Sequence, residues 1–399
     1  RNEDGSLMPY FLTVRNGGTK ALENVQHGNE KVLRARLDDA KFFFENDRKK
    51  TLEGHRDDLT RINYQEGMGD MRDKADRLQK LTEAIGKDWG FTAEEAADAD
   101  RAAFLSKSDL ATGMVTEFTE LQGEMGKEYA LLDGEKPEVA QGIFEQYMPR
   151  FAGDILPQQE IGRALSLADK LDNLAATFLR GLIPTGSQDP FALRRQTIGA
   201  VNILTDGKIH WDIRRGIEAA LALLPGDEET KKTVLSQIED FFRQRIKAIM
   251  LDEGIAYDII DAVLAGPVDD IYALFLKARS MAESQLKGEA ELRQAVTRLA
   301  NITKGKTGGK VDPSLFTEDV EKKLQDAFEA VSAKALPLFA SYEYGKALPA
   351  LKELTAPIND YLDNVMVMVD DEAVKNNRIS QLLATLALFN TWGDFSKLV

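Results

Sequence analysis

Charged side chains lie beside an apolar stripe in three separate segments of this 399-residue chain. Lys74 and Arg77 stand in the first segment, Lys107 and Asp109 in the second, and Asp169 in the third. Carboxylates bind Mg²⁺ weakly with the help of water, but a transition-metal site that generates hydroxide for attack on a phosphate also needs neutral imidazoles. We therefore expect no metal and no catalytic residue here. The five side chains are predicted to form a partly buried ion-pair network, because buried charges are normally paired.

Helices must position these residues. In each segment apolar residues recur every three or four positions, which is the spacing of one helix face. This spacing predicts one long helix over 105–130, a helix through 71–77 and another over 165–178, with their charges around one shared pocket. The stripe of the long helix consists of Leu110, Met114, Phe118, Leu121, Met125 and Tyr129, and that of the last helix of Leu165, Ala168, Leu171, Ala175 and Phe178.

This layout resembles the HD-type metal phosphohydrolases. The resemblance implies a histidine, a His-Asp doublet and a later aspartate as metal ligands. In this chain Ser108-Asp109 takes the place of the doublet, and Asp169 is the candidate for the later aspartate. No histidine directly precedes an aspartate, and none of the chain's histidines (His27, His55 and His210) lies in the helices concerned. A nucleotide phosphohydrolase stays an alternative function, which the missing imidazole disfavours.

The composition limits the classes of partner. The chain has 51 basic and 66 acidic residues and a net charge of −15, which argues against a protein that wraps nucleic acid in positive charge but not against local basic patches. It has no cysteine, which excludes disulfides and thiolate metal sites. No apolar run approaches the roughly 20 residues of a membrane span, and no signal peptide is visible. We expect a cytoplasmic protein without a DNA or membrane partner.

The remaining pattern predicts a mainly α chain of several domains. Residues 7–14 read as one strand, which we interpret as the edge of a domain that precedes residue 1. Thr92–Glu95 predicts a capping box, Asp189-Pro190 predicts an N-cap followed by proline at the first helical position, and Val365–Val369 reads as a core segment. The expected parts are a truncated N-terminal domain with a connecting helix (1–44), an HD-like helical domain (45–210), a helical linker (211–284) and a helical bundle (285–399).

Basic residues reverse the sign of the charge within the last part. No acidic residue occurs between positions 293 and 310, which carry five cations. Lysine and arginine attract phosphates, and asparagine and arginine can read exposed bases, so we predict an RNA contact here; a solvated helix end with a flexible loop is the alternative. The residues predicted to bind RNA from their charge and placement are Arg298, Asn301, Lys304 and Lys306, Asn377 and Arg378 in the final helix, and Arg194 and Arg195 after a Pro/Gly-rich loop.

Long blocks of the chain resemble the bacterial glycyl-tRNA synthetase beta subunit family. These blocks are residues 28–47, 105–110, 121–126, 184–195 and 365–371. The last part of the chain is also similar to the DALR-type anticodon-binding domain of class I arginyl and cysteinyl synthetases. The changed ligands of the HD-like pocket agree with this resemblance, since the family's own HD-like domain departs from the hydrolase ligands.

The resemblance implies an α2β2 enzyme that attaches glycine to tRNA(Gly) with ATP and Mg²⁺. Its class II catalytic site lies in the separate alpha subunit, so this chain itself is expected to be non-catalytic and to hold no cofactor. Its role would be recognition of tRNA(Gly). The C-terminal domain would hold the anticodon arm, and the HD-like domain would support the tRNA body or acceptor side. A helical scaffold that only joins the alpha subunit to another partner stays open.

Overall fold

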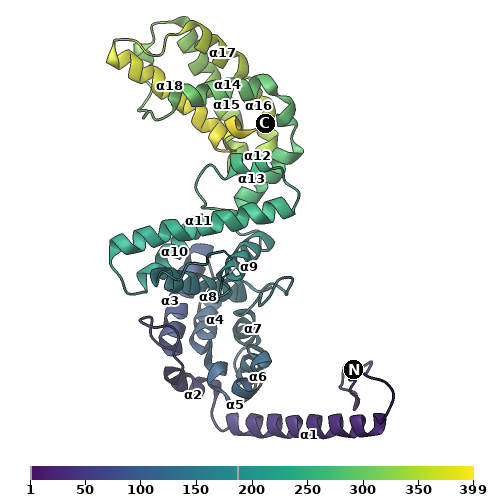
Figure 1. Ribbon diagram of the computed structural model, residues 1–399. Helices are drawn as coiled ribbons and strands as arrows, with labels where there is room; N and C mark the ends of the chain where they lie inside the picture. The colour runs from purple at the N-terminus through teal and green to yellow at the C-terminus, as the bar shows by residue number, and fades with distance from the viewer. Residues whose placement is uncertain (1, 187) are drawn as a thin grey trace.

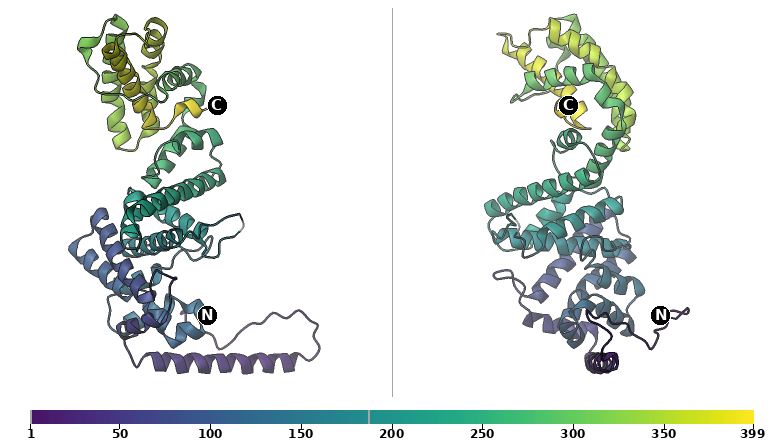
Figure 2. Two further views of the ribbon diagram at one scale, coloured as in Figure 1. Left: turned by 60° about the vertical axis from the view of Figure 1, so that its left-hand side comes forward. Right: turned by 45° about the vertical axis from the view of Figure 1, so that its right-hand side comes forward.

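The computed structural model describes residues 2–186 and 188–399, which form an elongated column of helices (Figure 1). The helices follow one another along this column in sequence order, from α1 at one end to α14–α18 at the other, as the further views also show (Figure 2). The described residues contain 18 α-helices, and their strand-like pairing is limited to three isolated bridges. The mainly α class is thus confirmed. Among the described helices, none combines the length and the apolar character that crossing a membrane requires.

The lower part of the column is a bundle built around α8 (Glu160–Leu179). This helix is buried along nearly its whole length, as expected for a helix covered on most of its faces. Leu165, Leu171 and Leu174 are at most 1% exposed, and burying such a side chain contributes about 1.5–3 kcal/mol. The helices that pack on α8 are α3 (Met71–Trp89), α4 (Ala93–Leu105), α7 (Pro137–Glu145), α9 (Leu193–Asp206), α10 (Ile213–Ala222) and α11 (Glu228–Asp252).

The upper part of the column follows α11, which crosses above the lower bundle (Figure 1). The C-terminal end of the chain is fixed by Trp392. This side chain is fully buried and donates from Nε1 to the Lys277 carbonyl (3.2 Å) and to Ser280 Oγ (3.0 Å). Both acceptors lie on α13, so the last residues of the chain are tied to the middle of the column. The upper helices are α12 (Tyr257–Val263), α13 (Ile271–Glu283), α14 (Ala290–Thr303), α15 (Asp319–Ala340), α16 (Leu348–Lys352), α17 (Thr355–Asn364) and α18 (Glu372–Asn390).

At the other end, α1 (Leu22–Asp47) projects from the bundle (Figure 1). Its last residue anchors it, because the buried Asp47 carboxylate accepts from the Gly113 and Met114 amides at 2.8 Å each. The strand predicted at 7–14 is wrong: these residues are irregular and exposed, since they have no sheet among the described residues to join. The expected boundary between residues 44 and 45 falls inside α1.

The single long helix predicted over 105–130 is also wrong. The segment is broken into short pieces because polar side chains take the backbone amides that a continuous helix would use. Thr112 Oγ1 accepts from the Val115 amide, and the Asp109 carboxylate accepts from the Gly123 amide at 2.7 Å. The pieces are η2 (Ser108–Ala111), α5 (Gly113–Glu117), η3 (Thr119–Leu121) and α6 (Glu124–Leu132), with α2 (Leu52–Arg56) and η1 (Asp57–Arg61) beside them.

Two predicted helix starts have different outcomes. The capping box of Thr92 and Glu95 is confirmed at the start of α4. Asp189 accepts from the Leu193 (2.8 Å) and Arg194 (3.0 Å) amides, so it does satisfy the start of α9. However, α9 begins at Leu193, so Pro190 lies in the turn before the helix and not at its first position. The loop before α9 satisfies the helix start through a longer turn than the sequence pattern indicates.

Candidate functional site

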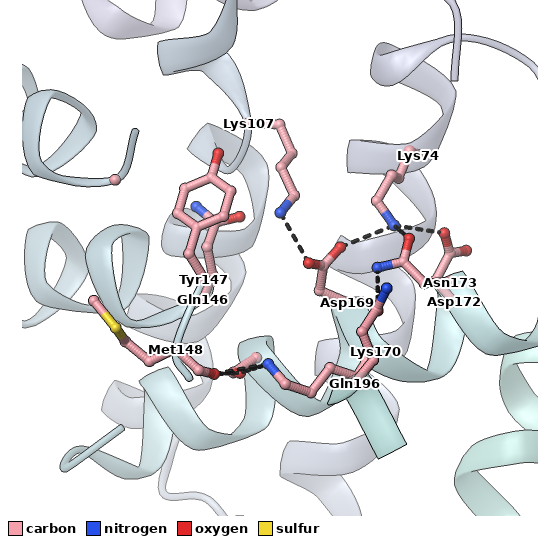
Figure 3. Close-up of polar contacts among 12 residues, drawn as sticks. Lys74, Lys107, Gln146, Tyr147, Met148, Asp169, Lys170, Asp172, Asn173 and Gln196 are labelled. Atoms are coloured by element: carbon pink, nitrogen blue, oxygen red, sulfur yellow. Dashed lines mark hydrogen bonds and ion pairs between the residues drawn. The ribbon is translucent and has the colours of Figure 1, made fainter. Parts of the chain in front are cut away.

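A buried charge cluster lies where α3, α8 and the end of α4 meet (Figure 3). Asp169 receives two ammonium groups: Lys74 Nζ lies 2.8 Å from its Oδ1, and Lys107 Nζ lies 3.0 Å from its Oδ2. Lys74 also contacts Asp172 at 2.9 Å, and Arg77 forks onto the Asp172 carboxylate at 2.6 and 3.1 Å. The structure thus brings four of the five predicted pocket residues into one ion-pair network.

The pairing decides which of these groups are charged. Burial opposes ionisation of Asp169, but the charges of Lys107 and Lys74 outweigh it and hold the pKa of this carboxyl below its usual value. Burial likewise opposes protonation of Lys74, yet Asp169 and Asp172 raise its pKa. For Lys107, burial prevails over Asp169 and lowers the pKa. The network is held together by charges that are largely withdrawn from water.

Asp109 is buried next to the network but forms no ion pair within the described part of the chain. Its carboxylate accepts from the Gly123 amide and, at 2.9 Å, from Tyr147 Oη. Burial raises its pKa, in spite of these hydrogen bonds. The predicted role of Asp109 as a fifth member of the ion-pair network is therefore corrected: it ties the loop before α6 to the end of α7.

Lys170 is a third buried lysine, which sequence reasoning missed. Its Nζ points away from Asp169 and donates to the Met148 carbonyl and to Ser166 Oγ, each at 2.7 Å (Figure 3). Burial lowers its pKa to about 7, because the charge of Asp169 offsets the cost of burial only in part. Asp172 was missed as well. The helical spacing of Asp169 and Asp172, three residues apart on one face, is the signal that could have found it.

The donor set of this cluster does not fit a divalent metal. The HD-type layout would place a metal against Asp169, but both oxygens of that carboxylate already face ammonium groups. Ammonium groups repel a metal cation and offer it no lone pair. Within the described residues, no group of three or more His, Asp or Glu side chains is arranged to hold a metal ion. The lysines thus supply the positive charge that a metal would bring.

The predicted RNA-binding residues of α14 and the following loop lie on the surface or near it. Asn301 and Lys304 are exposed, and Lys306 is partly exposed with its Nζ 3.1 Å from Met368 Sδ. Neither lysine forms an ion pair with a carboxylate in the described part of the chain. Arg298 is already engaged, because it contacts Asp363 at 2.6 Å and the Asn359 side chain at 3.0 Å.

Asn377 and Arg378 do not lie free on this surface. Arg378 is 5% exposed and pairs with the fully buried Glu321 at 3.0 Å, and it donates further to Thr317 Oγ1 and the Met366 carbonyl. Asn377 is 4% exposed and exchanges two hydrogen bonds with the backbone of Asp312. Both side chains are buried, because α18 turns this face toward α15 and the loop that precedes it, so the structure does not present them to RNA as the prediction requires.

Arg194 and Arg195 lie at the start of α9 with a third arginine nearby. Arg194 donates to the Gly186 carbonyl (2.7 Å) and Arg195 to the Arg150 carbonyl (3.2 Å), so both guanidiniums contact neutral oxygens. Burial and the like charge of Arg194 lower the pKa of Arg245 on α11. Arg245 was not predicted, because no local pattern marks it and the fold brings it from more than 50 residues away.

Two family models and several known relatives match this chain. A family model described as the glycyl-tRNA synthetase beta subunit matches residues 1–265, and one described as a DALR anticodon binding domain matches residues 292–393. The chain is 44% identical over 398 residues to the glycine–tRNA ligase beta subunit of Clostridioides difficile, and 41% identical over 402 residues to that of Desulforamulus reducens. Each alignment covers 100% of this chain but 58% of the relative.

The chain therefore spans somewhat more than half the length of these relatives. The two matched regions follow the division of the structure: the lower bundle and α11 fall within the first region, and the second runs from the first turn of α14 past the end of α18. The first model covers well over half of the chain. On these grounds, the chain belongs to the glycyl-tRNA synthetase beta subunit family.

Proposed function

We propose that this chain is the tRNA-binding part of a glycine–tRNA ligase beta subunit. It recognises tRNA(Gly), while the alpha subunit carries out glycyl transfer with ATP and Mg²⁺ in the cytoplasm. The observation that carries this proposal is the pair Lys304 and Lys306, which stay free of carboxylates among the described residues of a chain with net charge −15. They lie in the region that matches an anticodon binding domain.

Two separate surfaces of the chain contact the tRNA in this proposal. The α14 edge, with Asn301, Lys304 and Lys306, contacts the anticodon arm, where lysines hold phosphates and asparagine reaches base edges. Arg194 and Arg195, with Arg245 behind them, face the body or acceptor side of the tRNA. Guanidiniums bonded to carbonyl oxygens keep their full positive charge, so this second surface still attracts phosphates.

A fluorescence titration tests the proposal. The full 399-residue chain is titrated with tRNA(Gly), with an anticodon-changed tRNA(Gly) and with an unrelated tRNA, at two salt concentrations. We expect the tightest binding to the unaltered tRNA(Gly), with affinity that falls as salt rises. Replacing Lys304 and Lys306 by glutamine should lower the slope of log K against log salt by about 1 to 2, since each phosphate contact contributes about 0.7–0.9.

The matched control is K322Q/K323Q. These two lysines are exposed on α15, and their replacement removes the same charge at a different place on the same module. The control should leave the slope within error of the unaltered chain. Equal, weak and salt-insensitive binding of all three tRNAs would overturn the proposal and favour a scaffold that only joins the alpha subunit to another partner.

A further inference from the structure

In the loop between α17 and α18, two exposed methionines alternate along the chain with two buried valines. Val365 and Val367 are 6% and 7% exposed, whereas Met366 and Met368 are 73% and 56% exposed. The core segment predicted for 365–369 is thus only half right. Solitary exposed apolar residues are ordinary, but a paired set on one loop indicates a contact surface.

The backbone of this loop is fixed. Arg378 Nη1 donates to the Met366 carbonyl at 2.8 Å, and Arg378 is itself held by Glu321 at 3.0 Å. At the other end, the Asp371 carboxylate accepts from the first amides of α18. The buried side chains of Val365 and Val367 also hold the loop against the protein. Because the backbone is already fixed, binding an apolar surface here orders only the two side chains, and flexible thioethers can adapt to its shape.

The basic loop after α14 lies against the methionines. Lys306 Nζ is 3.1 Å from Met368 Sδ, and the Gly309 amide donates to Ser380 Oγ (2.8 Å) on α18. The second contact holds the basic loop on the same helix that follows the methionines. The loop thus sets an apolar pair next to Lys306, which has no carboxylate partner among the described residues, and this combination matches a polyanion with exposed apolar faces. A nucleic acid with unstacked bases has both features, since its bases have apolar faces and its backbone is anionic.

We propose that Met366 and Met368 form a contact surface for unstacked bases of an RNA loop, whose phosphates are held by Lys304 and Lys306. This inference rests on the proposed tRNA-binding function and adds the residues that distinguish a loop from a duplex. In a duplex the faces of the bases are stacked and out of reach, so the methionines select RNA whose bases are splayed out.

The test uses the full chain and two RNA probes: the anticodon stem-loop of tRNA(Gly), and a hairpin of the same stem with its loop closed by added base pairs. The variant M366S/M368S removes the apolar surface, and M366L/M368L keeps it. We expect the serine variant to bind the open loop about threefold to tenfold more weakly and the closed hairpin as before, since the lost apolar contact faces bases only. The salt slope should not change.

The leucine variant should bind like the unaltered chain, which shows that the apolar surface and not the loop's integrity is measured. Unchanged binding of the open loop by M366S/M368S, in a chain that prefers the open loop, overturns the inference. So does self-association of the unaltered chain in sedimentation that the serine variant abolishes, since a second copy would then cover the methionines. If the unaltered chain binds neither RNA, the tRNA-binding function itself fails.

Discussion

The lower bundle and the C-terminal module use their lysines in opposite ways. Lys74 and Lys107 are each 3% exposed and lie within 3.0 Å of a carboxylate oxygen. Lys304 and Lys306 reach the surface, and neither pairs with a carboxylate in the part of the chain that the structure describes. The buried lysines hold segments of the bundle together through their ion pairs, whereas the two lysines at the surface remain available to an external anion. Two basic groups that look alike in sequence thus differ in what they are free to bind.

The arginines of the C-terminal module show the same difference. Arg378 resembles Lys74, because it pairs with a fully buried carboxylate, Glu321. Arg298 is intermediate, since it is paired with Asp363 but remains 42% exposed. A cation near a candidate interface is therefore informative only together with its partner and its exposure. Replacing the carboxylate partners one at a time distinguishes cations paired inside the protein from cations that are available at its surface.

The largest effect is expected for Asp169→Asn. This change leaves the buried Lys74 and Lys107 without one of their counter-charges, and breaking a buried pair typically costs about 3–5 kcal/mol. Urea unfolding should show a loss of that order in the free energy of unfolding. Affinity for tRNA, measured on the folded variant at low temperature, should stay within about twofold, because the cluster is largely buried and lies apart from the proposed RNA contacts. A hydrolase pocket would instead show metal-dependent phosphatase turnover that this change abolishes.

An intermediate effect is expected from the titration of Lys170. Its pKa is about 7 in the folded chain and near the ordinary 10.5 when unfolded. Between these values the unfolded state binds more protons, so stability rises with pH from about 7 to 9, with a slope approaching 1.4 kcal/mol per pH unit. The depressed pKa of Lys107 acts in the same direction. Urea unfolding at pH 6, 7, 8 and 9 measures the slope.

Lys170→Met provides the control for this titration. Methionine keeps most of the side-chain volume and removes the titrating group, so the variant should show a clearly shallower rise of stability between pH 7 and 9. A slope equal to that of the unaltered chain would mean that Lys170 remains charged throughout, and that water or a carboxylate reaches it.

The smallest effect is expected for Asp363→Asn at the surface. Exposed ion pairs contribute about 0–1 kcal/mol, so the free energy of unfolding should hardly change. The substitution frees Arg298 and removes a negative charge from the module that carries Lys304 and Lys306, so tRNA should bind about twofold to fivefold more tightly at low salt. The gain should fade as salt is raised. Weaker binding would show that the Arg298–Asp363 pair orients the arginine for its contact.

Much of this architecture could be predicted from the pattern of apolar and charged residues in the sequence. The stripe through Leu165, Leu171 and Phe178 predicts α8, and the charges beside it predict the shared pocket of three segments. The failures have local causes. Residues 105–130 keep a helical stripe, but Thr112 and Asp109 take amides away from the helix. The expected strand at 7–14 has no sheet among the described residues to join.

The sequence by itself determined the helical class, the family and the acid-free basic interval after residue 292, because periodicity, motif blocks and charge are properties of neighbouring positions. The tertiary structure alone decided which cations are buried. Lys107 meets Asp169 across 62 positions, and Arg378 meets Glu321 across 57. No local pattern encodes such distances: they are set by how the helices pack, and packing decides whether a charge is paired inside the protein or left for a partner.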